Sequence, residues 1–330
     1  MFFHPSTILF IFFLLFSLTM MISLNSWFLI WFFIEMNLLS FIPLILVKKN
    51  KYCVESSLKY FFIQTLSSIL ILVGLVLMFM DMGIYEFFFI GGLSIKLGFA
   101  PFHQWVVNVV EGLSWPLVGL LLTIQKVGPF ILLGYLYAMK ENLSYVIYAL
   151  SLVSSFFGCV GGLFTSSLRK ILVFSSISHA SWMILGLISS IYLWGLYFIF
   201  YIMILFSVMS ILNFYNLSNL NHMFLKLSFF SSLILGVSVL SMGGMPPMTG
   251  FVSKFIVMKE FIVLYNFFIL IFLLTSVFIS LFFYSRVFMF NFIFLVNKNL
   301  FLSSDKKKLG YPLFVNISGF VLIPFIMGVL

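Results

Sequence analysis

Long apolar runs are the feature that most constrains how this chain can fold. About eleven segments approach the roughly 20 apolar residues that a helix needs to cross a bilayer core. They lie at 5–23, 26–47, 58–80, 86–110, 115–138, 144–164, 170–189, 191–214, 228–262, 264–294 and 311–330. The sequence therefore predicts an all-α polytopic membrane protein, in which no stretch between the runs is long enough for a separate domain.

The composition excludes a soluble protein and argues against nucleic acid as a partner. Of the 330 residues, 63% are hydrophobic and 8% are charged, which leaves too little charge for a water-facing surface. The formal net charge is +9, but the basic residues gather in short segments between the apolar runs. This distribution is typical of charges that set the orientation of a membrane protein.

The loop charges predict that orientation. Loops after odd-numbered runs hold few basic residues beyond Lys140 and Lys259. Loops after even-numbered runs hold Lys48, Lys49, Lys51, Lys59, Arg169, Lys170, Lys226, Lys298, Lys306, Lys307 and Lys308. By the positive-inside rule, we expect the N-terminus and the even loops to face the inner compartment, and the C-terminus to face the outer one.

Two lysines lie inside apolar sequence, on either side of a predicted helix break. Lys96 and Lys126 are far from any polar loop, and a charge at the bilayer centre costs roughly 2.5–3.5 kcal/mol on insertion scales. Gly98 and Pro101 predict that the helix breaks just after Lys96. A broken helix at membrane depth must face protein or a wet cavity. The stretch therefore indicates a path for ions or protons.

The break recurs later in the chain. Gly98-Phe-Ala-Pro101 in the fourth run is echoed by Gly243-Gly-Met-Pro246 in the ninth. A repeat displaced by five spans inverts its copy across the membrane, and inverted repeats with paired broken helices are typical of transporters. We predict one transmembrane domain over 1–330, made of a first repeat at about 5–138, a second at about 144–294 and a last helix at about 311–330.

Glu35, Lys96 and Lys126 each allow two interpretations. Glu35 could be a neutral glutamic acid hydrogen-bonded between helices, or a carboxylate paired with a buried lysine. The lysines could extend to an interface, although Lys126 lies too deep in its run to do so easily. Burial disfavours a charged lysine and a nearby carboxylate favours it, so a lysine under both influences can exchange protons. That property suits a proton relay.

The second break has its own lysine. Lys254 follows Pro246 within the same run. It could end a half-helix and face lipid headgroups, or it could serve the break as Lys96 does. Arg286 is a lone cation for which we expect a structural role.

His103 and His179 are candidate auxiliary relay residues. His103 directly follows the first break. Ser175, His179 and Trp182 are spaced i, i+4 and i+7, so they share one helical face. That face could order water for proton transfer, or form a polar seam between helices. Both histidines are too isolated from other ligand types to predict a metal site.

The sequence offers no redox cofactor site. Cys53 and Cys159 are too few for an iron–sulfur cluster, which needs four ligands. No GxGxxG or P-loop motif is present to bind a nucleotide. We therefore expect no cofactor in this chain.

Six stretches identify a family resemblance. They are IEMNLLSFIPL with Glu35, ESSLKYFFIQ from Glu55, KLGFAPFHQWV from Lys96, LLTIQKVGP with Lys126, LRKILVFSSISHASWM from Leu168 and LSMGGMPPMTGFVSKF near Lys254. In this order the chain resembles the antiporter-like membrane subunits of the proton-pumping NADH:ubiquinone oxidoreductase, respiratory complex I. The match spans nearly the whole chain.

The resemblance implies a function and a set of roles. It implies two inverted five-helix repeats, with Glu35 and Lys96 as a charge pair, Lys126 as a central relay and Lys254 as the outlet-side lysine. The chain would then be part of an enzyme whose NADH, FMN, iron–sulfur clusters and ubiquinone belong to partner subunits. Its partners would be other membrane-arm subunits and lipids such as cardiolipin.

The resemblance also bears on localisation. The chain lacks roughly three N-terminal spans of longer bacterial relatives, which resembles the animal mitochondrial form. It implies the mitochondrial inner membrane, with the N-terminus in the matrix and the C-terminus in the intermembrane space. Two rival interpretations stay open: a free-standing cation/proton antiporter, which normally keeps a longer N-terminal bundle, and a structural scaffold, which would need no buried lysines.

Overall fold

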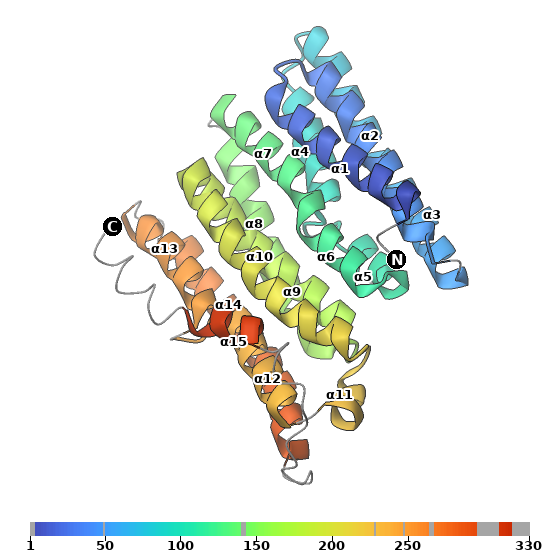
Figure 1. Cartoon of the computed structure of the whole chain (residues 1–330). Coiled ribbons are helices and arrows are strands. Elements are labelled where there is room, and N and C mark those ends of the chain that lie inside the picture. Colours follow the sequence, from blue (N-terminus) through green and yellow to red (C-terminus); the bar gives the residue numbers. More distant parts are fainter. Residues whose placement is uncertain are drawn as a thin grey trace. The chain divides into compact units, whose positions relative to one another are not determined.

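The chain divides into two compact units, each built from helices (Figure 1). The computed structural model describes residues 4–48, 50–139, 143–227, 229–246, 248–263, 267–295 and 310–318. Unit 1 spans Met1–Ser144 and unit 2 spans Tyr145–Leu330. Within the described residues the only β-structure is an isolated bridge between Ser167 and Asn219.

Unit 1 is organised around its third helix, which packs against α2, α4 and α5. Helices α1 and α7 complete the unit, since α1 packs against α2 and α7, and α7 packs against α4. The helices are α1 (Pro5–Ser23), α2 (Trp27–Leu46), α3 (Lys51–Phe79), α4 (Tyr85–Leu97), α5 (Gln104–Gly112), α6 (Trp115–Leu122) and α7 (Ile124–Met139).

Unit 2 is organised around α10, which packs against α9, α12, α13 and α15. Helix α9 is the most deeply buried of its long helices, since 18 of its 22 residues are buried. The helices are α8 (Ser144–Phe164), α9 (Leu168–Ser189), α10 (Ile191–Phe214), α11 (Leu220–Lys226), α12 (Phe229–Gly243), α13 (Thr249–Val263), α14 (Phe267–Leu295) and α15 (Gly310–Ile317).

The predicted membrane spans agree with these helices. Within the described residues, eight helical spans are long and apolar enough to cross a membrane when α6 and α7 are counted together as Trp115–Met139. Each matches a predicted run. The predicted runs 86–110 and 228–262 are pairs of half-helices, α4–α5 and α12–α13, so both predicted breaks are confirmed. Most of the predicted run 311–330 lies outside the described residues.

Two boundaries differ from the prediction. Helix α3 begins at Lys51 instead of 58, because polar turns extend the helix beyond its apolar run. An ion pair between Lys59 and Glu55, spaced i, i+4, supports these turns. The predicted run 115–138 is interrupted at Thr123, whose backbone leaves regular helical geometry at φ −117° and ψ −79°. Its hydroxyl donates to the Gly119 carbonyl oxygen at 2.7 Å, an arrangement that bends helices.

Glycine closes the first half-helix in unit 1. Gly98 ends α4 in the left-handed conformation, with φ +71°. Its N–H donates to the Ile95 carbonyl oxygen, and the Phe99 N–H donates to that of Ser94. These two bonds form a Schellman motif, which satisfies carbonyls at the helix end.

The same motif closes the first half-helix in unit 2. Gly244 ends α12 with φ +78°. Its N–H donates to the Ser241 carbonyl oxygen, and the Met245 N–H donates to that of Leu240. Gly244 is therefore the counterpart of Gly98, so the two breaks align one residue later than the Gly243-Gly-Met-Pro246 match suggested.

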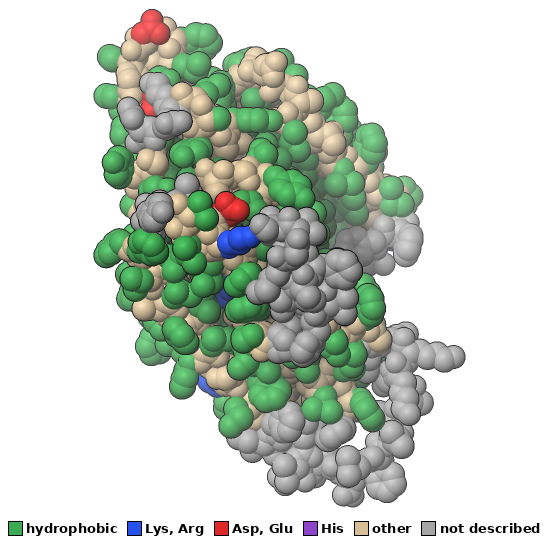
Figure 2. All heavy atoms as spheres, turned by 90° about the vertical axis from the view of Figure 1, so that its left-hand side faces the viewer, with side chains coloured by type: hydrophobic (Ala, Val, Ile, Leu, Met, Phe, Trp, Pro, Cys, Tyr) green, Lys and Arg blue, Asp and Glu red, His purple; other side chains and the backbone are tan. Residues whose placement is uncertain are grey.

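The helices present apolar side chains outward as well as inward. Phe12 on α1, Phe62 on α3 and Phe278 on α14 are each more than half exposed. Figure 2 shows one face on which hydrophobic side chains are widespread and charged ones are few. Such a surface suits a hydrocarbon environment, where polar side chains are costly.

Candidate functional site: a pocket with two lysines and a second lysine site

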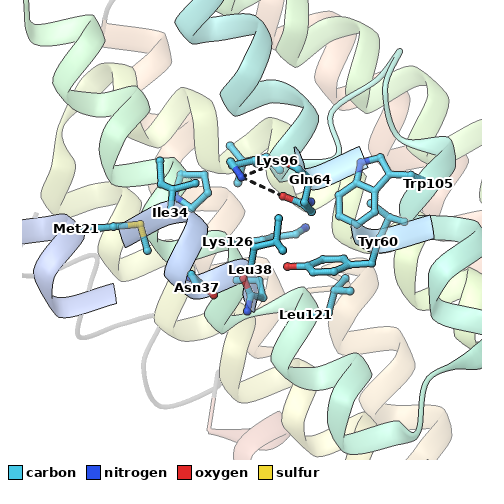
Figure 3. Close-up of a pocket in the computed structure, with 14 residues that line it drawn as sticks. Met21, Ile34, Asn37, Leu38, Tyr60, Gln64, Lys96, Trp105, Leu121 and Lys126 are labelled. Carbon is cyan, nitrogen blue, oxygen red and sulfur yellow. Dashed lines mark hydrogen bonds between the residues drawn. The ribbon is translucent and has the colours of Figure 1, made fainter. Parts of the chain in front are cut away.

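A small pocket, in which a few polar side chains interrupt a mainly apolar lining, lies inside unit 1 (Figure 3). Its lining comes from α1, α2, α3, α4, α5, α6 and α7, and it includes two of the predicted site residues, Lys96 and Lys126. Water molecules could occupy about 30 Å³ of it. That volume is enough for a water molecule if polar partners are present.

Lys96 lies on the last turn of α4 and reaches α3. Its Nζ donates to the Oε1 atom of Gln64 at 3.4 Å and to the Gln64 backbone carbonyl oxygen at 3.5 Å. Both contacts are near the long limit of a hydrogen bond. Gln64 is buried, at 5% exposure, so its neutral amide is the direct partner of the lysine.

Glu35 lies on α2 and acts on Lys96 from farther away. The two side chains are within range of an electrostatic interaction. No salt bridge with an N–O distance of 4.0 Å or less joins these two side chains, however, and the recorded contacts of the Lys96 ammonium are with Gln64. The structure therefore places the predicted pair in one region but not in direct contact.

Lys126 is buried two helical positions after the start of α7, at 4% exposure. The bend at Thr123 comes just before α7 and sets the direction of its first turn, on which Lys126 lies. Pro129 weakens the turn further, because it has no N–H to donate to the Gln125 carbonyl four residues earlier. Local irregularity thus surrounds the lysine on both sides.

Two further polar groups line the pocket without having been predicted. The Oδ1 atom of Asn37 and the Nε2 atom of Gln125 are buried, and neither has a hydrogen-bond partner within the described part of the chain. One atom accepts and the other donates. Together with Lys96 and Lys126 they offer the two to four polar contacts that a buried water molecule needs.

His103 lies at the other side of the first break. It is the residue preceding α5 and is half-buried, and it is not part of the pocket lining. The break is bridged instead by Trp105, whose Nε1–H donates to the Ile95 carbonyl oxygen at 2.9 Å. This bond joins α5 to α4 across the interruption.

In unit 2, Lys254 bridges the second break. It lies on α13, at 6% exposure, and its Nζ donates to the Gly243 carbonyl oxygen at the end of α12 at 2.7 Å. The alternative in which Lys254 faces lipid headgroups is therefore wrong. A side chain from the second half-helix reaches back to a carbonyl of the first, as Trp105 does in unit 1.

His179 forms a polar contact between helices in unit 2. It lies on α9, at 4% exposure, with Nδ1 at 2.8 Å from the Tyr197 hydroxyl of α10. Its Nε2 is 3.1 Å from the Met242 carbonyl oxygen of α12. This helical face therefore takes part in a polar contact between α9, α10 and α12.

Arg286 has the structural role expected for it. From α14 it donates to the carbonyl oxygens of Leu163 at 2.6 Å, Thr165 at 2.7 Å and Gly162 at 3.3 Å. These carbonyls are at the C-terminal end of α8, where orphan acceptors need partners. The guanidinium therefore caps α8.

Within the described residues, no group of three or more His, Cys, Asp or Glu side chains could hold a metal ion. Cys53 and Cys159 are buried and free.

Comparison with known proteins identifies the family. The family described as NADH:quinone oxidoreductase/Mrp antiporter, TM, matches residues 24–91 and 80–280. The chain belongs to this family. It is 37% identical over 264 residues to NADH-ubiquinone oxidoreductase chain 2 of Anopheles gambiae, covering 76% of this chain and 75% of the relative. It is 38% identical over 256 residues to the protein of that name from Equus caballus, covering 73% of each.

Solved structures share the fold. A chain of respiratory complex I from Thermus thermophilus matches with a TM-score of 0.81 at 20% identity, covering 97% of this chain and 79% of the other. A chain of the Mrp complex from Dietzia matches with a TM-score of 0.71 at 14% identity, covering 92% of this chain and 63% of the other. The predicted antiporter-like all-α fold with two broken helices is thereby confirmed.

Proposed function

We propose that this chain is a proton-translocating subunit of the membrane arm of respiratory complex I. One observation carries the proposal: Lys96 and Lys126 line one pocket within a unit of apolar helices. Ionisable side chains at membrane depth are costly, and they typically mark ion or proton pathways. The family, which includes quinone oxidoreductases and antiporters, supports the same function.

Each ionisable side chain has its own role in this proposal. Glu35 and Lys96 act as a pair whose strength changes during the cycle, Lys126 passes the proton on, and Lys254 serves the outlet side. His103 and His179 are auxiliary relay residues. The Gln64 contact supports a changeable pair, because a neutral amide holds Lys96 without fixing it to a carboxylate. A direct buried ion pair would be harder to separate.

The redox chemistry belongs to other subunits under this proposal. NADH, FMN, iron–sulfur clusters and ubiquinone would bind to partners, while this chain contacts other membrane-arm subunits and lipids such as cardiolipin. The chain would lie in the mitochondrial inner membrane, with its N-terminus in the matrix and its C-terminus in the intermembrane space. Two inverted repeats would form one domain, as the matching closures at Gly98 and Gly244 suggest.

A free-standing cation/proton antiporter is the second candidate, favoured by the likeness to the Mrp complex chain. A native gel separates the two. Co-migration of this chain with NADH dehydrogenase activity in a very large assembly supports the first function. Migration alone, with Na⁺/H⁺ exchange in vesicles, supports the second. A scaffold role would require that replacing Lys96 and Lys126 leaves proton pumping unchanged.

A double-mutant cycle tests the Glu35–Lys96 pair. Glu35→Gln, Lys96→Met and the double variant are compared for assembly and, separately, for the number of protons pumped per electron. Removing both partners leaves no uncompensated buried charge, so we expect the double variant to assemble better than either single one. It should still pump poorly. Strictly additive assembly defects would mean that the two side chains do not interact.

A further inference from the structure

The His179 contacts contain information about its protonation that the sequence did not provide. Both ring nitrogens are engaged inside unit 2: Nε2 lies 3.1 Å from the Met242 carbonyl oxygen, and Nδ1 lies 2.8 Å from the Tyr197 hydroxyl. His179 and Tyr197 are 4% and 2% exposed, so bulk water does not supply either contact.

The Met242 carbonyl decides which nitrogen carries hydrogen. A carbonyl oxygen can only accept, so Nε2 must donate to it. In the neutral ring, Nδ1 is then the acceptor, and the Tyr197 O–H donates to it. While the Met242 contact persists, Nδ1 is the only atom of the ring at which a proton can be gained or lost.

The same contacts tie His179 to the break beside Lys254. Met242 and Gly243 are consecutive residues at the end of α12, and their carbonyls accept from His179 and Lys254 respectively. Tyr197 contacts the other ring nitrogen of His179, so it acts on the same histidine that reaches the end of α12 beside Lys254.

We propose that Tyr197 is a positioning residue for His179. The Tyr197 hydroxyl fixes the imidazole in the Nε2–H tautomer and occupies Nδ1, the only ring atom that can accept a proton. This inference deepens the proposed function and rests on it. A proton reaches Nδ1 either when the Tyr197 hydrogen turns away from it, or when that hydrogen transfers along the bond and another proton replaces it on the hydroxyl oxygen. Tyr197 would then accept from the Nδ1–H that forms.

The matched pair Tyr197→Phe and Tyr201→Phe tests this role in the assembled complex. Both tyrosines lie on α10, are 2% exposed and place their rings near His179, at centroid distances of 6.1 Å and 5.3 Å. The Tyr197 hydroxyl lies 2.8 Å from Nδ1 of His179, whereas no hydrogen bond joins the Tyr201 hydroxyl to this histidine. We expect Tyr197→Phe to slow proton translocation roughly two- to tenfold, which is the factor that corresponds to the loss of one neutral hydrogen bond. Tyr201→Phe should leave it unchanged.

The measurement is the rate of proton translocation per assembled complex, which does not depend on yield. Because Tyr197 acts through His179, Tyr197→Phe should cause no further loss in a His179→Leu background. An unchanged rate in Tyr197→Phe, the same loss in the His179→Leu background or complete failure to assemble would each overturn the role. Lys254→Met tests the proposed function separately: if it pumps normally, that function fails at this site whatever Tyr197 does.

Discussion

Gly244→Ala should damage the second break through both the backbone and Lys254. Gly244 ends α12 with φ +78°, where side chains are strained. A Cβ there would lie 3.0 Å from Cδ, 3.1 Å from Nζ and 3.2 Å from Cε of Lys254. These are the mobile end of a flexible side chain, so we expect the lysine to move and the backbone to stay.

The magnitude follows from two contributions. Holding a non-glycine residue in the left-handed region costs roughly 1–2 kcal/mol. Moving Lys254 away from the Gly243 carbonyl loses a hydrogen bond from a charged group, about 1.5–3 kcal/mol. Together these give about 2.5–5 kcal/mol if the bond is lost completely, a large share of the 5–15 kcal/mol that typically stabilises a folded protein.

The assay is assembly on a native gel, followed by the proton-to-electron ratio of the assembled complex. Gly195→Ala on α10 is the control, because a Cβ there meets nothing within 4 Å. Gly244→Asn separates the two contributions, since asparagine tolerates the left-handed region but still brings a Cβ towards Lys254. It should restore assembly more than pumping. If Gly244→Ala assembled and pumped like Gly195→Ala, the reasoning would be refuted.

Four further outcomes are expected. Gln64→Glu places a carboxylate where Lys96 now contacts an amide, and a tight ion pair there should slow pumping without loss of assembly. Unchanged pumping would count against the idea that the pairing of Lys96 changes during the cycle. Lys126→Ala should assemble and pump fewer protons per electron, because insertion becomes easier without the charge. Arg286→Lys cannot reproduce the three carbonyl contacts and should lower the thermal stability of the assembled protein while leaving its pumping ratio intact. Protease should cleave at Lys306–Lys308, which lies outside the described residues, in inverted vesicles that expose the matrix side, and should not cleave there in mitoplasts, which expose the other side.

Hydropathy and local breakers predicted most of the fold. Apolar runs located the spans, because a helix in lipid satisfies its own backbone, and glycine and proline located both breaks. The start of α3 at Lys51 was missed because the local ion pair between Lys59 and Glu55 supports polar turns that extend the helix beyond its apolar run. The bend at Thr123 depends on a side-chain bond within the helix, which a hydropathy scale does not register.

The site was predicted less completely than the fold. Charged residues in apolar runs stand out, so Lys96, Lys126 and Lys254 could be found from the sequence. Gln64 has no charge, and its contact with Lys96 joins two separate helices. Tyr197 looks like any aromatic residue of a membrane helix until α9 is packed against it. Contacts of this kind depend on tertiary structure, and a single sequence has no periodic signal for them.

The closure of α12 at Gly244 gives Lys254 a partner that carries no formal charge. The peptide dipoles of a helix add up to roughly half a negative elementary charge at its C-terminal end, and α12 ends within unit 2, where Lys254 reaches its last carbonyl. A field of this kind is fixed by the backbone, so it cannot be neutralised by protonation as a carboxylate can. When the lysine releases its proton, no compensating anion is stranded in the interior. An interrupted helix can therefore act as a permanent counter-charge that never titrates.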